Sequence, residues 1–153
     1  ALARYGNNMV PVDFYQQPTE PTRLFVYPFA RTQESLAAIA SGTPDPHLGH
    51  KLRFVNPASG ASPMPTMGAF CQRIPAGFET RDYQCTDGTL YVCLDGQATV
   101  CVANNEWLAQ KDDIFVVPSW QKLKILALQE TTLFSYSDRP AQQSLGLWRE
   151  ARH

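Results

Sequence analysis

The sequence predicts an all-β fold, a sandwich or a barrel, preceded by an extended arm. From position 51 to 137, short apolar runs rich in Val, Thr, Phe and Tyr alternate with turn residues. At 153 residues the chain is long enough for one domain with a sizeable core. No apolar run approaches the length of about 18 residues that a membrane span needs.

The first 30 residues are expected to form an interdomain linker or arm, and residues 31–153 one domain. The segment from Val10 to Phe29 contains four prolines and shows no sustained hydrophobic period, which favours an extended chain. Its aromatic residues indicate that the arm packs against other protein surface. The opening ALARYGNNM reads like the middle of a longer chain, so a fragment is expected.

A short helix is predicted over residues 32–40, followed by a loop. Thr32 can cap the first turn, Glu34 suits the positive end of the helix, and Gly42 follows as a stop. Leu36, Ile39 and Ala40 give this helix one apolar face. The prolines and glycine of PDPHLGH, residues 44–50, predict a loop before the first strand.

The apolar runs predict strands at 51–55, 66–74, 89–94, 98–102, 113–117, 122–128 and 132–137. Asp95-Gly96 is a signal for a tight hairpin. Lys122 and Lys124 flank Leu123 with a period of two, which indicates the solvated side of a strand. The tail from about Pro140 predicts one short closing helix, because proline suits a first helical turn.

Composition excludes several classes of protein. The net charge of −1 argues against a nucleic-acid partner, which would require a basic face. No membrane partner is expected, and no signal peptide is recognisable. The four cysteines form no C-x-x-C pair, so zinc-ribbon and thioredoxin sites are not predicted. Because free cysteines suit apolar strands, we expect reduced thiols and a cytoplasmic protein.

Two segments have the spacing of a metal-binding barrel motif without its ligands. Between Gly77 and Gly96 the chain resembles the cupin pattern, in which two His and one Glu bind metal, but Tyr83, Cys85 and Thr89 occupy those positions. In the segment resembling the second cupin motif, a turn at 118–120 is followed by Leu123 at the His position.

These replacements predict that the barrel binds no metal. A non-haem Fe(II) centre needs imidazole and carboxylate ligands with open positions for substrate and O₂. Tyr83 and Cys85 share one face of a strand, but a Tyr/Cys pair without His is a poor ligand set for Fe(II). Leu123 has no lone pair to donate.

Several longer runs resemble one family. Three runs are similar to the C-terminal cupin of a bicupin gentisate 1,2-dioxygenase: KLRFVNPASGASPMPTMGAFCQRIPAGFET, DIFVVPSW and LFSYSDRPAQQSLGLWREAR. ARYGNNMVPV resembles the segment that links the two cupins in that family. The same resemblance extends to the salicylate and 1-hydroxy-2-naphthoate 1,2-dioxygenases.

The resemblance implies a cupin fold, a double-stranded β-helix or jelly-roll barrel. It implies O₂-dependent ring cleavage of a small aromatic hydroxy acid by the full-length enzyme, at Fe(II) held by three His of the N-terminal cupin. It also implies that this chain pairs with its own N-terminal cupin, within a homo-oligomer. No metal ligand or catalytic residue of the family transfers to this chain.

The residues at the barrel mouth have two interpretations. Five residues there either line a small-molecule pocket or plug the barrel, as side chains do in small barrels. They are Tyr83, Cys85, Tyr91, Trp120 and Leu123. Trp120 either faces the pocket or fills the core. A nucleophilic Cys85 would need a neighbouring base, and no His is close to it in the sequence.

The remaining ionisable residues are also open to two interpretations. Asp45, His47 and His50 form a two-His, one-carboxylate site, or they are surface and capping residues of a loop. His153 is expected to fray at the chain end. Asp138-Arg139 and Arg149-Glu150 are catalytic charges, or ion pairs at a domain or subunit contact.

Three functions are therefore compatible with the sequence. The first is the metal-free, structural C-terminal cupin of a gentisate 1,2-dioxygenase-like enzyme. The second is a stand-alone cupin that binds a small aromatic acid without catalysis. The third is a divergent enzyme that uses Cys85.

Overall fold

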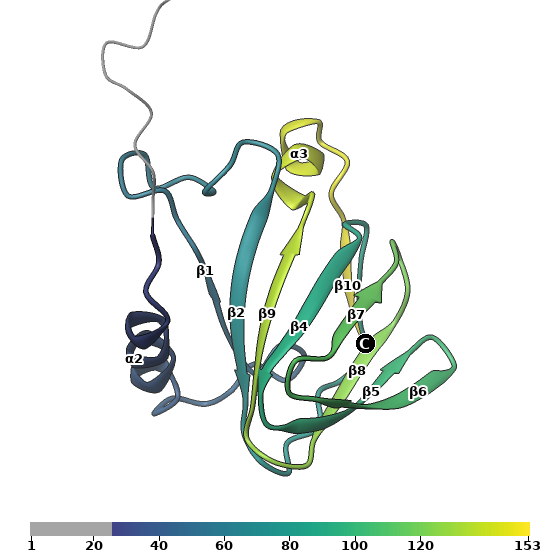
Figure 1. Ribbon diagram of the computed structural model, residues 1–153. Helices are drawn as coiled ribbons and strands as arrows, with labels where there is room; N and C mark the ends of the chain where they lie inside the picture. Colours follow the sequence, from purple (N-terminus) through teal and green to yellow (C-terminus); the bar gives the residue numbers. More distant parts are fainter. Residues whose placement is uncertain (1–25) are drawn as a thin grey trace, which may run out of the picture.

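The alternating apolar runs build two antiparallel β-sheets that pack face to face (Figure 1). The computed structural model describes residues 26–153. The first sheet has, in spatial order, β1 (His50–Arg53), β2 (Gly68–Ile74), β9 (Thr131–Ser137), β4 (Thr89–Asp95) and β7 (Ile114–Val117). The second has β10 (Glu150–Arg152), β3 (Tyr83–Cys85), β8 (Leu123–Ala127), β5 (Gln97–Val102) and β6 (Asn105–Gln110).

The core lies between the sheets because buried side chains recur with a period of two along the strands. On β4, for example, Tyr91 and Cys93 are buried, whereas Leu90 and Val92 on the opposite side are only partly covered. Ile74, Val100, Ile125 and Leu133 are among the residues that meet in this core. The all-β prediction is confirmed, and all seven predicted strands are present.

Three strands are not evident from the sequence. β6 has mostly exposed side chains, so it lacks the apolar alternation that reveals a strand. β3 and β10 have three residues each and pair with one another across 65 residues of chain or more. Such short strands depend on a distant partner and leave no local pattern.

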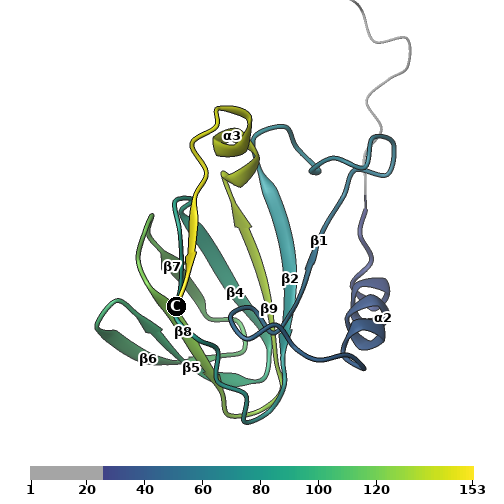
Figure 2. The ribbon, with the colours of Figure 1, turned by 180° about the vertical axis from the view of Figure 1, so that it is seen from behind.

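The chain end is more structured than predicted (Figure 2). The closing helix α3 (Arg139–Ser144) is confirmed, but it ends before Leu145, and the remaining tail returns as β10. His153 does not fray, because its backbone N–H donates to the carbonyl of Asp82 at 3.1 Å and its ring lies 2.8 Å from Gln84 Oε1.

The predicted hairpin at Asp95-Gly96 is wrong in its pairing. The turn is present, but β4 and β5 belong to different sheets, so the chain passes there from one sheet to the other. Gly96 has a φ of 86°, and a Cβ at this position would collide with the carbonyl oxygen of Glu130. The glycine is therefore required by the close approach of two chain segments.

Helix α2 (Phe29–Ile39) begins three residues earlier than predicted, and Thr32 is not its cap. Pro28 occupies the N-cap position, where its fixed φ leads into the first turn. Leu36 is the buried residue of this helix, and α2 lies against β1 and β2 outside the barrel (Figures 1 and 2).

The expected arm mostly lies outside the described residues, and the boundary expected after residue 30 falls within α2. Between residues 26 and 153, no helix is long and apolar enough to cross a membrane.

Candidate functional site

The strand register brings the three degenerate ligand positions together. Tyr83 and Cys85 lie on the same face of β3, and Leu123 on β8 is the direct partner of Tyr83. All three side chains are buried, as is Tyr91 on the facing sheet. The sequence alignment of the two motifs therefore corresponds to residues that are neighbours in space.

The side chains at these positions are held in neutral forms. Burial, together with the nearby charge of Asp87, raises the pKa of Cys85 to about 12. Burial also raises the pKa of Tyr83 and of Tyr91 well above the usual value. The Tyr83 hydroxyl donates to Glu150 Oε2 at 2.9 Å. At neutral pH this end of the barrel therefore presents a thiol and two phenols.

The most deeply buried charge of the ion pair at this site is that of Asp87, a residue that the sequence did not single out. Its side chain is fully buried, and it accepts hydrogen bonds from Trp148 Nε1 at 2.7 Å and from Arg139 Nε at 3.1 Å. Burial by itself raises the pKa of Asp87, but the Ser137 hydrogen bond, the Arg139 charge and the Trp148 hydrogen bond together hold that pKa below the ordinary value. The carboxylate is thus fixed in its charged form.

Arg139 and Trp148 close the barrel over Asp87. The guanidinium carbon of Arg139 lies 5.1 Å from the centre of the Phe70 ring and 4.8 Å from that of Trp148. Arg139 Nη2 also donates to the Tyr83 hydroxyl at 3.4 Å. Arg139 begins α3, so this helix and the tail that follows bring the closing residues to one end of the barrel.

Arg139 was expected to be a catalytic charge or to form an ion pair at a domain or subunit contact, but its partner is Asp87, an internal carboxylate of the same chain. The two residues are 52 positions apart. Asp87 lies within the segment TDG, a sequence that predicts only a turn. No local pattern could therefore pair Asp87 with Arg139.

A second cation, Lys51, points into the barrel from β1. Its partner in the ladder is Gln72, and its Nζ lies 5.0 Å from the centre of the Phe70 ring and 5.6 Å from that of Tyr91. Burial, together with the charge of Arg139, lowers the pKa of Lys51 to about 8. Within residues 26–153, Gln72 Oε1 and Ser135 Oγ are buried without a hydrogen-bond partner.

Trp120 does not enter the barrel. Its side chain is 45% exposed, and the residue has a φ of 62°, which turns the chain between β7 and β8. Its backbone binds instead, since the Trp120 N–H donates to the carbonyl of Cys85 at 2.7 Å. Of the five predicted mouth residues, Tyr83, Cys85, Tyr91 and Leu123 are thus gathered inside, and Trp120 is not.

The loop residues Asp45, His47 and His50 do not form the three-ligand site: His47 Nδ1 lies 3.9 Å from Asp45 Oδ1, but no metal-binding group of three is found among the described residues. Asp45 Oδ1 accepts the backbone N–H groups of His47 and Leu48, as in an Asx turn. Asp45 Oδ2 accepts from Arg152, whereas His50 is a buried residue of β1. The capping interpretation fits Asp45, but His50 is not on the surface.

The donor set of the barrel does not fit Fe(II). A neutral thiol, a neutral phenol and a leucine replace the imidazoles that such a centre requires. Among residues 26–153, no group of three or more His, Cys, Asp or Glu side chains is placed to hold a metal ion.

Comparison with known proteins finds close relatives. A gentisate 1,2-dioxygenase from Aquipseudomonas alcaligenes is 42% identical over all of this chain, which covers 44% of that relative. A 5-aminosalicylate 1,2-dioxygenase from Comamonas is 29% identical over 92% of the chain and 38% of its own length. The chain thus spans less than half the length of the curated relatives it matches. No family model matches.

Solved structures show the same fold. A variant of the salicylate 1,2-dioxygenase from Pseudoaminobacter salicylatoxidans superposes with a TM-score of 0.77 and 28% identity, over 83% of this chain and 39% of that one. Another structure of a salicylate 1,2-dioxygenase gives a TM-score of 0.79 over 99% of this chain and 45% of that one.

Proposed function

The chain is homologous to part of the gentisate- and salicylate-type ring-cleaving 1,2-dioxygenases, and we propose that it is their metal-free C-terminal cupin, with a structural role. In this proposal it supports an iron-bearing N-terminal cupin of the same polypeptide and contributes contacts to a homo-oligomer. The fold is the cupin barrel that the resemblance implied.

One observation carries the proposal. The barrel end where a cupin would hold metal contains buried Tyr83, Cys85 and Leu123, and the Asp87–Arg139 ion pair closes it. A buried carboxylate with several donors rigidifies its surroundings but leaves no open ligand position. This arrangement suits a supporting domain better than a reaction centre.

The chemistry would then take place in the other cupin. There, Fe(II) would bind a small aromatic hydroxy acid and O₂ together for ring cleavage. The cytoplasmic location that we propose is supported by four cysteines that form no disulfide bond: Cys71, Cys85, Cys93 and Cys101.

Metal analysis tests the proposal directly. The chain is refolded with Fe(II) under anaerobic conditions, desalted and analysed by elemental mass spectrometry. We expect no stoichiometric iron. One equivalent of iron that is lost in the Cys85→Ala or Tyr83→Phe variant would overturn the proposal.

A second function, binding of a small aromatic acid, is favoured by Lys51. This cation points into the barrel but keeps some exposure to solvent, faces the rings of Phe70 and Tyr91, and has no ion-pair partner among the described residues. A carboxylate could neutralise it. Calorimetric titration with gentisate would show binding that is lost in Lys51→Met but kept in Lys122→Met, a change on the outer surface. Absence of heat in the parent chain would exclude this function.

The third hypothesis, a Cys85 nucleophile, loses support. A thiol with a pKa of about 12 is protonated at neutral pH, and the thiolate is the reactive form.

A further inference from the structure

The outer face of the first sheet is apolar across five strands. Outward-facing residues lie side by side in the ladder, and one row is Leu52, Cys71, Phe134, Val92 and Ile114. The adjacent row is Phe54, Ala69, Tyr136, Leu90 and Val116, in which the Phe54 N–H donates to the carbonyl of Ala69. We call these ten residues the apolar face.

A solvated sheet normally alternates apolar and polar sides, so this face is exceptional. The next row along the same sheet is His50, Arg73, Thr132 and Asp95, which is polar. The outer side of the second sheet carries Lys124, Cys101 and Glu106 in one row, and Lys124 forms an ion pair with Glu79. The next outer row of the second sheet has two leucines, Leu126 and Leu108, on either side of Thr99. Uninterrupted apolar rows are therefore found on the first sheet.

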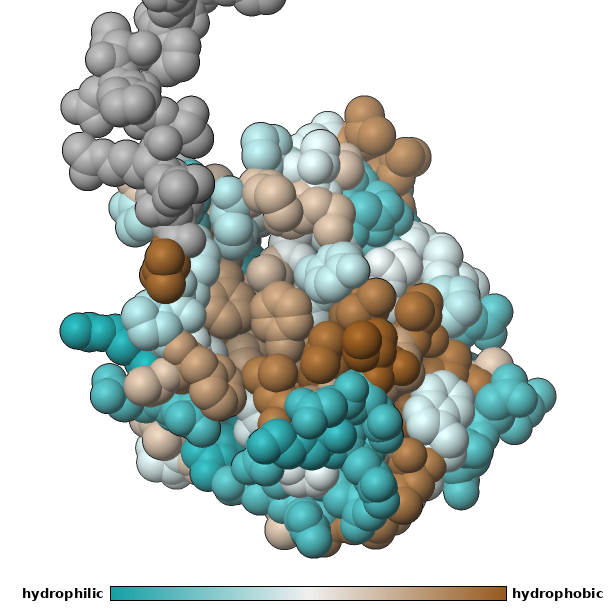
Figure 3. All heavy atoms as spheres, in the orientation of Figure 1, coloured by the Kyte–Doolittle hydropathy of each residue, from teal (hydrophilic) through white to brown (hydrophobic). Residues whose placement is uncertain are grey.

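The apolar face is open to solvent on β7 and β9. Ile114 is 65% exposed, Val116 55% and Tyr136 38%. Figure 3 shows apolar residues gathered over β9, β4 and β7, with a polar border below. A contiguous exposed patch of this kind marks a protein contact.

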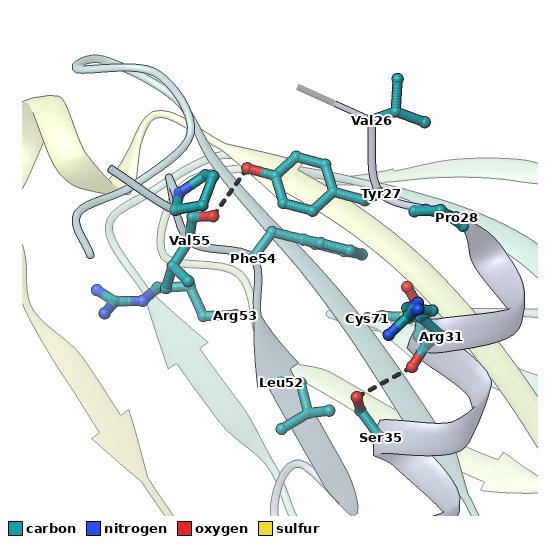
Figure 4. A pocket seen from close by; sticks show the side chains of 12 residues that line it. Val26, Tyr27, Pro28, Arg31, Ser35, Leu52, Arg53, Phe54, Val55 and Cys71 are labelled. Carbon is teal, nitrogen blue, oxygen red and sulfur yellow. Dashed lines mark hydrogen bonds between the residues drawn. The ribbon is translucent and has the colours of Figure 1, made fainter. Parts of the chain in front are cut away.

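A pocket of about 360 Å³ adjoins the apolar face, between α2 and β1 (Figure 4). Leu52, Phe54 and Cys71 belong both to its lining and to the face. The Tyr27 ring packs edge-on against Phe54 at 5.1 Å, and its hydroxyl donates to the Val55 carbonyl at 2.8 Å, so this wall is fixed. The Phe54 ring in turn lies 6.1 Å from Phe134. The pocket is thus a socket at one edge of the face.

We propose that the apolar face is where the remainder of a longer polypeptide docks, with one of its apolar side chains in the socket. This inference rests on the proposed function and names the surface through which the chain would support its partner. The chain spans 44% or less of the relatives described above, so the larger part of each is available as an occupant. A flat sheet face suits a second sheet, which packs about 10 Å away.

Hydroxyl-radical footprinting tests the docking surface. This chain alone is compared with the protein encoded by the complete reading frame. We expect oxidation of Ile114, Val116 and Tyr136 to fall several-fold in the complete protein. Leu108, which is 45% exposed on β6 of the other sheet, is the internal control and keeps its rate.

Three outcomes would overturn the inference: unchanged oxidation of the apolar face in the complete protein, a reading frame that adds nothing to this chain, or a second copy as the occupant. In the last case the isolated chain would sediment as a dimer, with the face already protected, and Val116→Lys would convert it to a monomer.

Substitution separates this inference from the proposed function. Ile114→Lys with Val116→Lys in the complete protein is expected to restore oxidation of Tyr136, whereas Leu108→Lys is not. Iron bound by the isolated chain would overturn the structural role and leave the footprint as it is. An unchanged footprint in a chain without iron would overturn only the docking surface.

Discussion

At the residue scale, the barrel end is organised by one buried carboxylate. Asp87 gathers Arg139 and Trp148, which come from a helix and a tail more than 50 residues later in the chain. Removing one partner of a buried charge is costly, because the charge stays behind without solvation. The contacts of Asp87 therefore hold the tail on the barrel.

Trp148→Phe removes the 2.7 Å hydrogen bond to Asp87 and keeps most of the ring. We expect the free energy of unfolding to fall by about 1.5–3 kcal/mol, the usual contribution of a hydrogen bond to a charged group. Trp120→Phe is the matched control, because that ring is exposed and should cost little. Urea unfolding of both variants measures the difference, and equal stability would contradict this role of Asp87.

Lys51 should give a characteristic pH dependence. Its pKa is about 8 in the folded chain and near 10.5 when exposed in the unfolded chain. Between these values the unfolded state binds more protons, so this group makes the folded chain more stable as pH rises. Three other groups have the opposite effect above about pH 9: they make the folded chain less stable as pH rises, because their pKa values are raised in the folded state. These groups are Tyr83, Cys85 and Tyr91.

The difference between the parent and Lys51→Met isolates the lysine. We expect Lys51→Met to be more stable than the parent near pH 7 and to lose that advantage between pH 8 and 10.5. The charged groups near Lys51 are Arg139 and Asp87, and Cys85 is the neighbouring thiol. Thermal unfolding at a series of pH values checks the trend. A constant difference would mean that Lys51 is not desolvated.

At the element scale, β3 and β8 carry the positions that would bind metal in a cupin. Tyr83 and Leu123 are direct partners, and Cys85 is on the same side of β3. The strands therefore supply the geometry, and only the side chains are unsuited to metal. The position is covered by Arg139 of α3, Glu150 of β10 and Trp148 of the segment between these elements.

A triple variant should show measurable Zn(II) or Fe(II) binding, because its three imidazoles would converge. Its substitutions are Tyr83→His, Cys85→His and Leu123→His. The affinity should be poor, since the neighbouring Glu150 and Arg139 are placed for the hydroxyl of Tyr83 and not for an imidazole. Burying a polar ring in place of Leu123 should cost about 1–3 kcal/mol. Metal titration by calorimetry, with the double variant that keeps Leu123 as control, measures both effects. A well-folded triple variant without metal would show that the positions do not converge.

At the scale of the whole molecule, the chain has one apolar sheet face and one filled barrel end. Over residues 26–153 the filled end offers no ligand set for iron, and the exposed face is where we propose that a partner docks. Both features suit a supporting half of a larger enzyme.

The isolated chain should therefore not consume O₂ with gentisate when Fe(II) is supplied. An oxygen electrode measures the rate against an iron-only blank. Turnover above the blank that is abolished in Cys85→Ala would favour a divergent enzyme. Turnover that survives this change would point to a site elsewhere in the chain.

The sequence by itself determined the all-β class, seven of the ten strands within residues 26–153 and the degenerate motif positions. Each of these features depends on a short stretch of chain. Examples are the alternation of buried and partly exposed residues in β4 and the spacing of the motif from Gly77 to Gly96. The first two mouth residues, Tyr83 and Cys85, could be assigned because they stand at fixed distances from these glycines.

Only the tertiary structure decided which strands pair and which charges meet. The turn at Gly96 changes sheet, and Trp120 points outward with a left-handed backbone. Three charged residues come together from distant elements: Lys51 from β1, Asp87 from the segment after β3, and Arg139 from the start of α3. Such contacts join residues far apart in the chain, and their energies depend on burial, which no local pattern of residues records.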